Sequence, residues 1–171
     1  MSWNFSLPEG EGPWYRRVAV VCLCILAGAH FFEPPVALAF DPHEDNCLPD
    51  LHLALLVNRP PSSVAVGDYV FWKPSGPTSE VKAQYLLKWV AGVGGDRLTI
   101  KNRKVSINGH VVATGLDLLD PERADPLAFE RDEIIPAGSL FVIGTHPHSF
   151  DSRYWGYLNV RQVQGKAFKV M

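Results

Sequence analysis

The sequence has little of the residue types that mark several common classes of protein. Its 171 residues include three cysteines, Cys22, Cys24 and Cys47, and two of these lie inside one apolar run, which argues against a disulfide framework. The cysteines and histidines show no zinc-ligand spacing, so we expect no metal and no other cofactor. Charged residues make up 20% of the chain and the net charge is −2, which argues against a nucleic-acid partner and against disorder.

Glycine and proline, by contrast, are frequent, with 14 of each. They separate short apolar runs, which favours many short strands joined by turns over long helices. The acidic, proline-containing segment 114–132 is expected to form a long loop or an insertion. The sequence therefore predicts an all-β domain of short, mostly antiparallel strands. The expected strands lie in residues 51–57, 67–72, 83–93, 98–100, 104–107, 110–113, 138–144 and 163–170, with a tight turn at Asn108-Gly109.

The N-terminal region contains the one long apolar run, Val18 to Phe32, directly after Arg16-Arg17. The run is shorter than the roughly 18–20 residues of a typical transmembrane helix. Its basic flank and the aromatic pair Trp14-Tyr15 nevertheless fit a membrane interface. A signal-anchor helix, a cleaved signal peptide and a buried core helix all remain open, and the flanks favour the signal anchor. With the arginines on the cytoplasmic side, the rest of the chain lies across the membrane.

These features divide the chain into three parts. Residues 1–17 are expected to be cytoplasmic, residues 18–40 to form a membrane anchor or signal segment, and residues 41–171 to form a domain on the periplasmic side of an inner membrane. One N-terminal transmembrane helix would make the protein single-pass. Ala37-Leu38-Ala39 has the small-x-small pattern of a signal-peptide cleavage site, so a cleaved chain would be cut there.

Lys88 interrupts an apolar strand, YLLKWVAG. A lysine in such a strand usually points to solvent, because buried lysine is rare. The alternative is a lysine that points into a site of low dielectric constant, where desolvation lowers the pKa of an amine and makes it a usable base. The strand alone leaves both interpretations open.

A second polar stretch, HSFDSRYWG, contains Ser149, Asp151, Ser152 and Arg153. An aspartate and an arginine two residues apart on one strand face the same side and could pair. The two serines are short enough to orient a neighbouring amine. Read alone, the stretch fits a polar turn held by one salt bridge. The adjacent His146-Pro147-His148 lacks a third ligand, so it does not predict a metal site.

A third stretch, DNCLPDL, carries the only cysteine outside the apolar run, Cys47. Together with VGDYVFWKP, KWVAGVGGD and GTHPHSFDSRYWG, in this order, it resembles the type I signal peptidases, membrane-bound serine proteases that use a Ser/Lys dyad. The resemblance runs from about Cys47 to Tyr157. It implies a signal-peptidase-like fold in which Lys88 is the general base, Ser149 and Ser152 orient its amine, and Asp151 and Arg153 support the site.

The CLP motif, the HSFDSRY ending and the short chain are most similar to the conjugative-transfer peptidases of the TraF type. Those enzymes mature pilin subunits in plasmid transfer systems, and some join the ends of the pilin into a ring. The resemblance thus implies a membrane-anchored periplasmic endopeptidase. Its partner would be an exported precursor peptide, a pilin first of all, bound as an extended strand beside the inner membrane.

The chain departs from the family at the position of the nucleophilic serine, where it has Cys47. Asp45 stands where the family often has a small hydroxyl residue, and a carboxylate there would oppose a developing oxyanion unless it points away. A thiol has an ordinary pKa of about 8.5 and ionises more readily beside an ammonium group. We therefore expect Cys47 and Lys88 to act as the dyad, with the Cys47 N–H as an oxyanion donor.

Other interpretations remain open. The cysteine would also fit a catalytically retired signal-peptidase fold that binds pilin or a secretion partner, although an idle site has no chemical need for a lysine in an apolar strand. A self-cleaving repressor of the LexA type shares the β-fold, but that class needs a DNA-binding domain where this chain has an apolar run. A purely structural thiol at Cys47 is disfavoured by the proline and charged residues around it.

Overall fold

The computed structural model describes residues 18, 21, 35–40, 47–48, 51–119 and 125–170. The chain divides into two units, Met1–Pro34 and Pro35–Met171, and the second unit contains the folded domain. Apart from Val18 and Val21, the apolar run predicted to reach the membrane lies outside the described residues, as does Asp45. None of the helices in the described ranges has the length and apolarity to cross a membrane.

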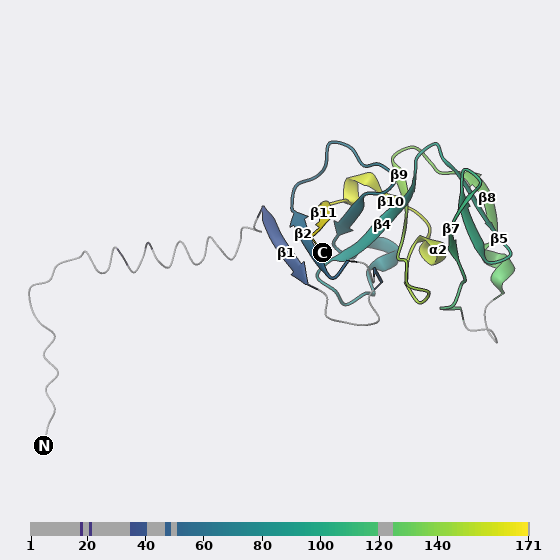
Figure 1. Ribbon diagram of the computed structural model, residues 1–171, viewed down its shortest axis with the longest axis horizontal. Helices are drawn as coiled ribbons and strands as arrows, with labels where there is room; N and C mark the ends of the chain where they lie inside the picture. The colour runs from purple at the N-terminus through teal and green to yellow at the C-terminus, as the bar shows by residue number, and fades with distance from the viewer. Residues whose placement is uncertain are drawn as a thin grey trace, which may run out of the picture. The chain divides into compact units, whose positions relative to one another are not determined.

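Seven strands form one antiparallel sheet in the order β1-β2-β11-β3-β4-β9-β10 (Figure 1). The antiparallel pairing agrees with the prediction of an all-β domain. The strands are β1 Val36–Phe40, β2 Leu53–Val57, β3 Tyr69–Trp72, β4 Leu86–Val93, β9 Ser139–Ile143, β10 Leu158–Asn159 and β11 Gly165–Lys169.

Four further strands form a second antiparallel sheet in the order β7-β6-β5-β8. The predicted turn between β6 and β7 forms, with Asn108 at φ 52° and Gly109 at φ 83°, the left-handed pair that a tight hairpin turn requires. Short helical turns connect the strands. The elements of this part are β5 Arg97–Lys101, β6 Lys104–Ile107, β7 His110–Thr114, β8 Arg131–Ile134, η1 Gly76–Thr78, η2 Pro126–Phe129, α2 Ser152–Trp155 and η3 Val160–Gln162.

The largest buried cluster lies between the two sheets. Ala91 of β4 and Phe141 and Ile143 of β9 pack against residues of β5 and β6. The β5 and β6 contributions are Leu98, Ile100, Val105 and Ile107. Two further clusters are centred on Trp72, Val90 and Val142 and on Leu48, Leu51, Ala54 and Ala167. Burial of β4 and β9 from both sides makes this strand pair a rigid support for side chains near its end.

Three strands differ from the sequence-based prediction, and one of them, the two-residue β10, is too short to give a pattern. Val36–Phe40, placed in the membrane segment 18–40, forms β1 and pairs with β2, so the folded domain begins at Pro35 rather than at residue 41. Arg131–Ile134, whose first two residues were placed in the acidic loop, forms β8 beside β5. Both were missed for a physical reason. β1 is apolar on both faces, like a membrane segment, and β8 is too charged to show an apolar alternation.

Candidate active site

Lys88 lies in the middle of β4 and is 3% exposed. Its Nζ donates a hydrogen bond to Ser149 Oγ at 2.9 Å. Among the described residues, no carboxylate lies within ion-pair distance of this amine. Of the two interpretations of the strand, the structure therefore takes the buried one. A buried amine held only by a hydroxyl is unusual for a structural lysine and typical of a general base.

Gly144 brings the strand pair and the serine together. It follows β9 one residue beyond Ile143, which lies opposite Trp89, so it adjoins Lys88 on the neighbouring strand. A Cβ at residue 144 would lie 2.2 Å from Ser149 Oγ and 2.7 Å from the carbonyl oxygen of Cys47. Cys47 and Ser149 thus approach the same point of the backbone, and only glycine leaves room for both.

Cys47 is a free, half-buried cysteine that is fixed through its backbone. The His146 N–H donates to the Cys47 carbonyl oxygen at 3.2 Å. On its other side, Leu48 is buried in the cluster with Leu51, Ala54 and Ala167. These contacts place the predicted nucleophile beside the loop that carries Ser149. The predicted oxyanion role of its own N–H stays a prediction.

Asp151 and Arg153 form the buried ion pair that the sequence indicated. Arg153 Nε and Nη2 donate to the two carboxylate oxygens at 2.8 Å each, with side chains 1% and 0% exposed. Burial alone would lower the pKa of Arg153, but the hydrogen bonds and charge of Asp151 outweigh it and raise that pKa. Asp151 Oδ2 also accepts from the Gly144 N–H at 2.9 Å. The pair therefore neutralises itself and holds Gly144 at the same time.

The rest of the Arg153 guanidinium bonds to main-chain carbonyls. Nη2 reaches the oxygens of Ser149 at 3.3 Å and His146 at 3.5 Å, which are part of the site loop. Nη1 reaches Thr114 at 3.5 Å and Gly115 at 3.4 Å. Arg153 thus connects the loop that bears Ser149 to the start of the segment 114–132.

Ser152 makes a contact that the sequence did not predict. Its Oγ accepts from the Val142 N–H at 3.0 Å, and it is fully buried there. Ser149 is the serine that bonds to the Lys88 amine and Ser152 joins α2 to β9, so a part for Ser152 in orienting Lys88 stays a prediction. The local structure also differs from the predicted strand, because Asp151 caps α2 through a bond from the Arg153 N–H.

Sequence reasoning missed the backbone contributions of His146 and Gly144. The only signal for Gly144 was its place at the start of the last motif, and His146 gave none, because it acts through its N–H and carbonyl rather than its imidazole. Within the described ranges, no three His, Cys, Asp or Glu side chains are grouped as metal ligands. The predicted lack of a metal and of a cofactor stays a prediction.

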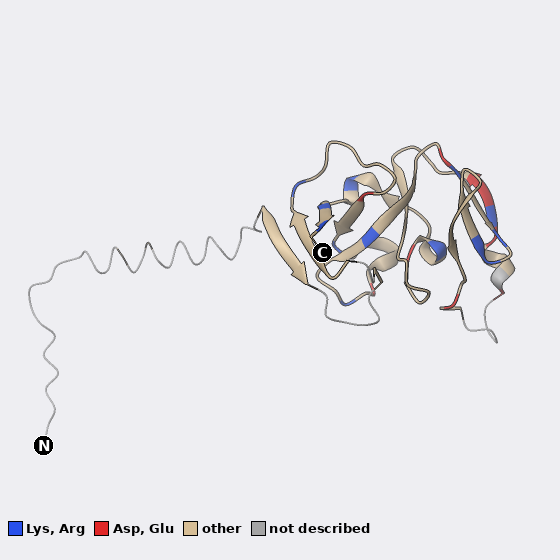
Figure 2. Ribbon diagram, viewed as in Figure 1, with Lys and Arg blue, Asp and Glu red and all other residues tan. Residues whose placement is uncertain are grey.

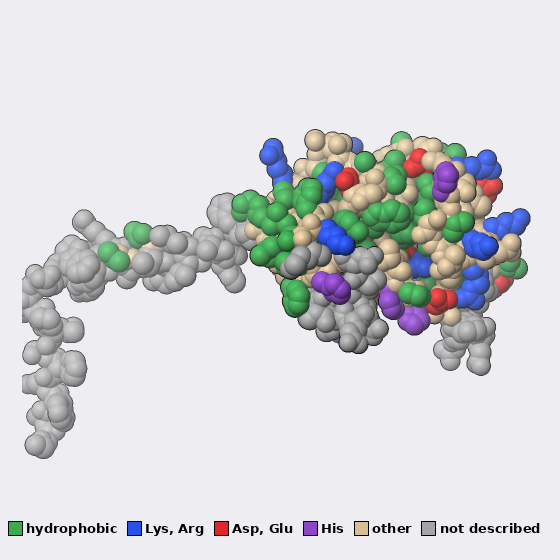
Figure 3. All heavy atoms as spheres, in the orientation of Figure 1, with side chains coloured by type: hydrophobic (Ala, Val, Ile, Leu, Met, Phe, Trp, Pro, Cys, Tyr) green, Lys and Arg blue, Asp and Glu red, His purple; other side chains and the backbone are tan. Residues whose placement is uncertain are grey.

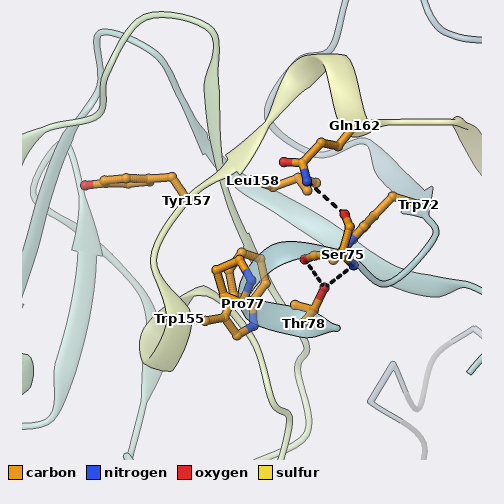
Figure 4. A pocket seen from close by; sticks show the side chains of 8 residues that line it. All are labelled: Trp72, Ser75, Pro77, Thr78, Trp155, Tyr157, Leu158 and Gln162. Carbon is orange, nitrogen blue, oxygen red and sulfur yellow. Dashed lines mark hydrogen bonds between the residues drawn. The ribbon is translucent and has the colours of Figure 1, made fainter. Parts of the chain in front are cut away.

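A small pocket elsewhere in the domain contains none of these candidate residues (Figure 4). Its volume is about 10 Å³, enough for one water molecule and far too little for a peptide. It is lined by Trp72, Ser75, Pro77, Thr78, Trp155, Tyr157, Leu158 and Gln162.

Comparisons with known proteins identify the family of the chain. A family model described as signal peptidase, peptidase S26, matches residues 13–171. A signal peptidase I from Bacillus caldolyticus is 30% identical over 95 residues, which are 50% of this chain and 52% of the relative, so the chain spans about half the length of the curated relative it matches. A crystal structure of a signal peptidase I from Enterococcus faecalis shows 20% identity and a TM-score of 0.40, over 61% of this chain and 97% of that one. Because the family model spans most of its length, this chain belongs to the signal peptidase family, peptidase S26.

Proposed function

We propose that this chain is a membrane-anchored endopeptidase that matures an exported precursor, a conjugative pilin first of all, with Cys47 as the nucleophile and Lys88 as the general base. The observation that carries the proposal is the buried Lys88–Ser149 hydrogen bond beside the backbone of Cys47. A lysine shielded from water and oriented by one hydroxyl suits proton transfer more than it suits stability.

In the proposed acylation, Lys88 takes the thiol proton of Cys47, and Sγ attacks the carbonyl carbon of the scissile peptide bond. The tetrahedral intermediate then collapses as Lys88 passes the proton to the leaving amine, and a thioester remains on Cys47. Ser149 keeps the amine aimed throughout, and the Asp151–Arg153 pair keeps the Ser149 loop and Gly144 in place.

The thioester has two outcomes. The thioester holds the segment of the substrate that lies N-terminal to the cut. Water releases this segment as a linear product, whereas the segment's own N-terminal amine closes a ring and returns the thiol, so a cyclic pilin requires a cut that removes a C-terminal segment of the pilin. Amines attack thioesters readily relative to water, so the cysteine favours ring closure. A cyclic product has the mass of the cleaved linear product minus one water, and mass spectrometry of the matured pilin distinguishes the two. A linear product alone would contradict ring closure and leave peptidase activity in place.

The activity is tested with the full-length chain in membranes and a precursor that carries its leader peptide. We expect Cys47→Ala and Lys88→Met to abolish maturation and Cys47→Ser to retain part of it, because a hydroxyl can still use the Lys88 base. Lys101→Met removes an exposed lysine of β5 and serves as the control with full activity. Maturation by Cys47→Ala at the normal rate would rule out the dyad.

A substrate-independent measurement separates the active enzyme from a retired fold that only binds pilin. The alkylation rate of Cys47 at pH 7, followed on its own peptide by mass spectrometry, is expected to fall in Lys88→Met and to stay unchanged in Lys101→Met. A rate that is indifferent to Lys88 means that the two side chains do not cooperate. The binding role would then replace the peptidase role.

A further inference from the structure

Two charged side chains of β8 leave the strand on its core side. Arg131 lies opposite Ile100 of β5, which is 1% exposed. Glu133 lies opposite Leu98, which is 0% exposed, and residues directly opposite one another share a face of the sheet. Leu98 and Ile100 belong to the core between the two sheets. Arg131 and Glu133 therefore lie on the inner face of the four-stranded sheet, at its β8 edge.

The outer face of the same strand has a different character. Asp132 pairs there with Arg97 of β5, and both side chains are more than half exposed. Charged side chains of both signs gather at this end of the domain (Figure 3), where water can solvate them. Arg131, by contrast, is half-buried. Both it and Glu133 bond to residues of the segment 152–157, which directly follows the site loop.

Arg131 bonds to the main chain of α2. Its Nη2 donates to the carbonyl oxygens of Arg153 at 3.1 Å and of Ser152 at 3.3 Å. The last carbonyls of a helix need a partner from outside it, and a helix of four residues is not stable alone. The one bond that closes this turn at its end runs from the Gly156 N–H to the Ser152 carbonyl oxygen at 3.1 Å. The guanidinium of Arg131 therefore supports a turn that has little support of its own.

Glu133 holds the chain just beyond α2. The Tyr157 hydroxyl donates to Glu133 Oε1 at 2.7 Å, and the Tyr157 ring contacts Phe141 of β9 edge-on, with 6.2 Å between ring centroids. Burial first, and then the Glu133 carboxylate, raise the pKa of Tyr157 above its ordinary value of 10. The hydroxyl thus keeps its proton at neutral pH and remains a donor. β8 contacts this segment at two points from one face.

The turn that Arg131 supports carries Arg153 of the candidate site. The Arg153 guanidinium donates to the carbonyl oxygens of Ser149 at 3.3 Å and His146 at 3.5 Å. Ser149 in turn accepts the hydrogen bond from Lys88 Nζ at 2.9 Å. A displacement of α2 would therefore move the loop whose serine orients the Lys88 amine.

We infer that Arg131 is a positioning residue for the candidate active site: β8 holds α2 through Arg131, and α2 holds the Ser149 loop through Arg153. The bond between Tyr157 and Glu133 is a second attachment of the same segment. Inward-pointing charges on an edge strand also discourage pairing with other chains, but that use requires no bonds to α2. The expected effect on catalysis rests on the proposed function, whereas the attachment of α2 to β8 does not.

The first test measures hydrogen exchange by mass spectrometry on the full-length chain in detergent and needs no substrate. In Arg131→Met, we expect the amides of Ser149, Tyr154 and Gly156 to exchange at least about fivefold faster, while the amides of β3 and β4 keep their rates. The control is Arg97→Met, which removes an arginine from the outer face and should leave all of these rates unchanged. Unchanged exchange in Arg131→Met, or equal acceleration throughout the domain, would overturn the inference.

The second test measures precursor cleavage by the same variants. We expect Arg131→Met to lower kcat by about 10- to 100-fold with little change in KM, because the base is misaligned while the substrate still binds. Arg131→Lys keeps a cationic donor and should recover part of the rate, and it replaces Arg131→Met in both tests if that variant does not fold. Arg97→Met should cleave normally.

Full activity of a variant with faster exchange at α2, or a loss confined to KM, would contradict the positioning role. A wild-type chain that cleaves no precursor would instead contradict the proposed function. The exchange measurement would then still decide whether Arg131 holds α2, so the two failures are distinguishable.

Discussion

Two aspartate–arginine pairs in this domain have the same geometry and opposite surroundings. Arg153 donates hydrogen bonds to Asp151 from Nε and Nη2 at 2.8 Å each, and Arg97 donates to Asp132 from the same two nitrogens at the same distances. The first pair is 1% and 0% exposed, the second 63% and 53%. The pairs differ in what surrounds them rather than in how they bind.

This difference in burial separates the surroundings of the candidate site from the solvated surface. The buried pair fills its remaining hydrogen-bonding groups with Gly144 and the carbonyls of the site loop. The exposed pair sits among charges of both signs on β5 and β8, which Figure 2 shows on the four-stranded sheet. Water can replace either partner there. Removing one partner of an ion pair should therefore destabilise this domain strongly only where water cannot solvate the remaining partner.

The largest expected effect is the loss of stability in Arg153→Met. Removing one partner leaves the Asp151 carboxylate buried, and we expect the free energy of unfolding to fall by about 3–5 kcal/mol. The matched change, Arg97→Met, removes the same side chain from the same geometry on the surface. We expect it to be indistinguishable from the wild type in urea unfolding of the full-length chain in detergent. Equal losses in the two variants would show that burial does not decide the difference.

The next largest effect is expected at Gly144, which bonds to Asp151 and adjoins Ser149 and Cys47. In Gly144→Ala, the added Cβ would force Ser149 Oγ or the Cys47 carbonyl away, and a displacement of this size costs about 10²-fold in rate. Gly138→Ala is the control, because nothing lies within 4 Å of a Cβ there and only its φ of 75° is strained. We expect precursor cleavage to collapse in the first variant and persist in the second. A fully active Gly144→Ala would mean that the close approach is not needed.

A third prediction concerns a substitution that we expect to keep or raise stability rather than lower it. Lys88 is buried with a hydroxyl as its partner among the described residues, so we expect Lys88→Met to keep or raise the melting temperature while it abolishes cleavage. A residue that stabilised the fold would behave like Arg153. Thermal melting and precursor cleavage on the same preparation check this, and a clear loss of stability would assign Lys88 a structural role.

The same contrast explains how much of the molecule could be predicted. Most strand positions and the Asn108-Gly109 turn follow from local patterns of apolar and turn residues, and these agree with the structure, whereas β1, β8 and β10 were missed. The site residues Lys88, Ser149, Asp151 and Arg153 were found because their motifs have unusual chemistry. The contact of Ser152 with Val142 could not be predicted, because two serines three positions apart look alike in sequence and only the fold shows which one bonds to Lys88.

Main-chain contributions could not be predicted at all. His146 serves the site with its N–H and carbonyl, which every residue except proline has, so no side-chain pattern marks it. β1 was misassigned for a related reason. Its sequence, VALAF, is apolar on both faces, and only the pairing with β2 distinguishes a sheet edge from a membrane segment.

The smallest effect comes from a pair of intermediate burial. Lys166 Nζ lies 2.6 Å from Asp68 Oδ2, with side chains 23% and 27% exposed, and the Ala65 N–H donates to the same oxygen at 2.8 Å. Burial alone would raise the pKa of Asp68, but these two partners outweigh it and hold that pKa below the ordinary value of 3.8. The pair should therefore behave between the two aspartate–arginine pairs.

The lowered pKa of Asp68 determines how the stability contributed by the Asp68–Lys166 pair changes with pH. Because the pKa of Asp68 is lower in the folded than in the unfolded chain, the interaction contributes fully above the unfolded value and is lost as the pH falls through the folded one. We expect Asp68→Asn to lower the unfolding free energy by less than about 1 kcal/mol at neutral pH, and this difference should shrink below about pH 4. Urea unfolding of both chains across this range measures it. A difference that stays constant with pH would mean that the loss in Asp68→Asn does not come from the charge of the Asp68 carboxylate.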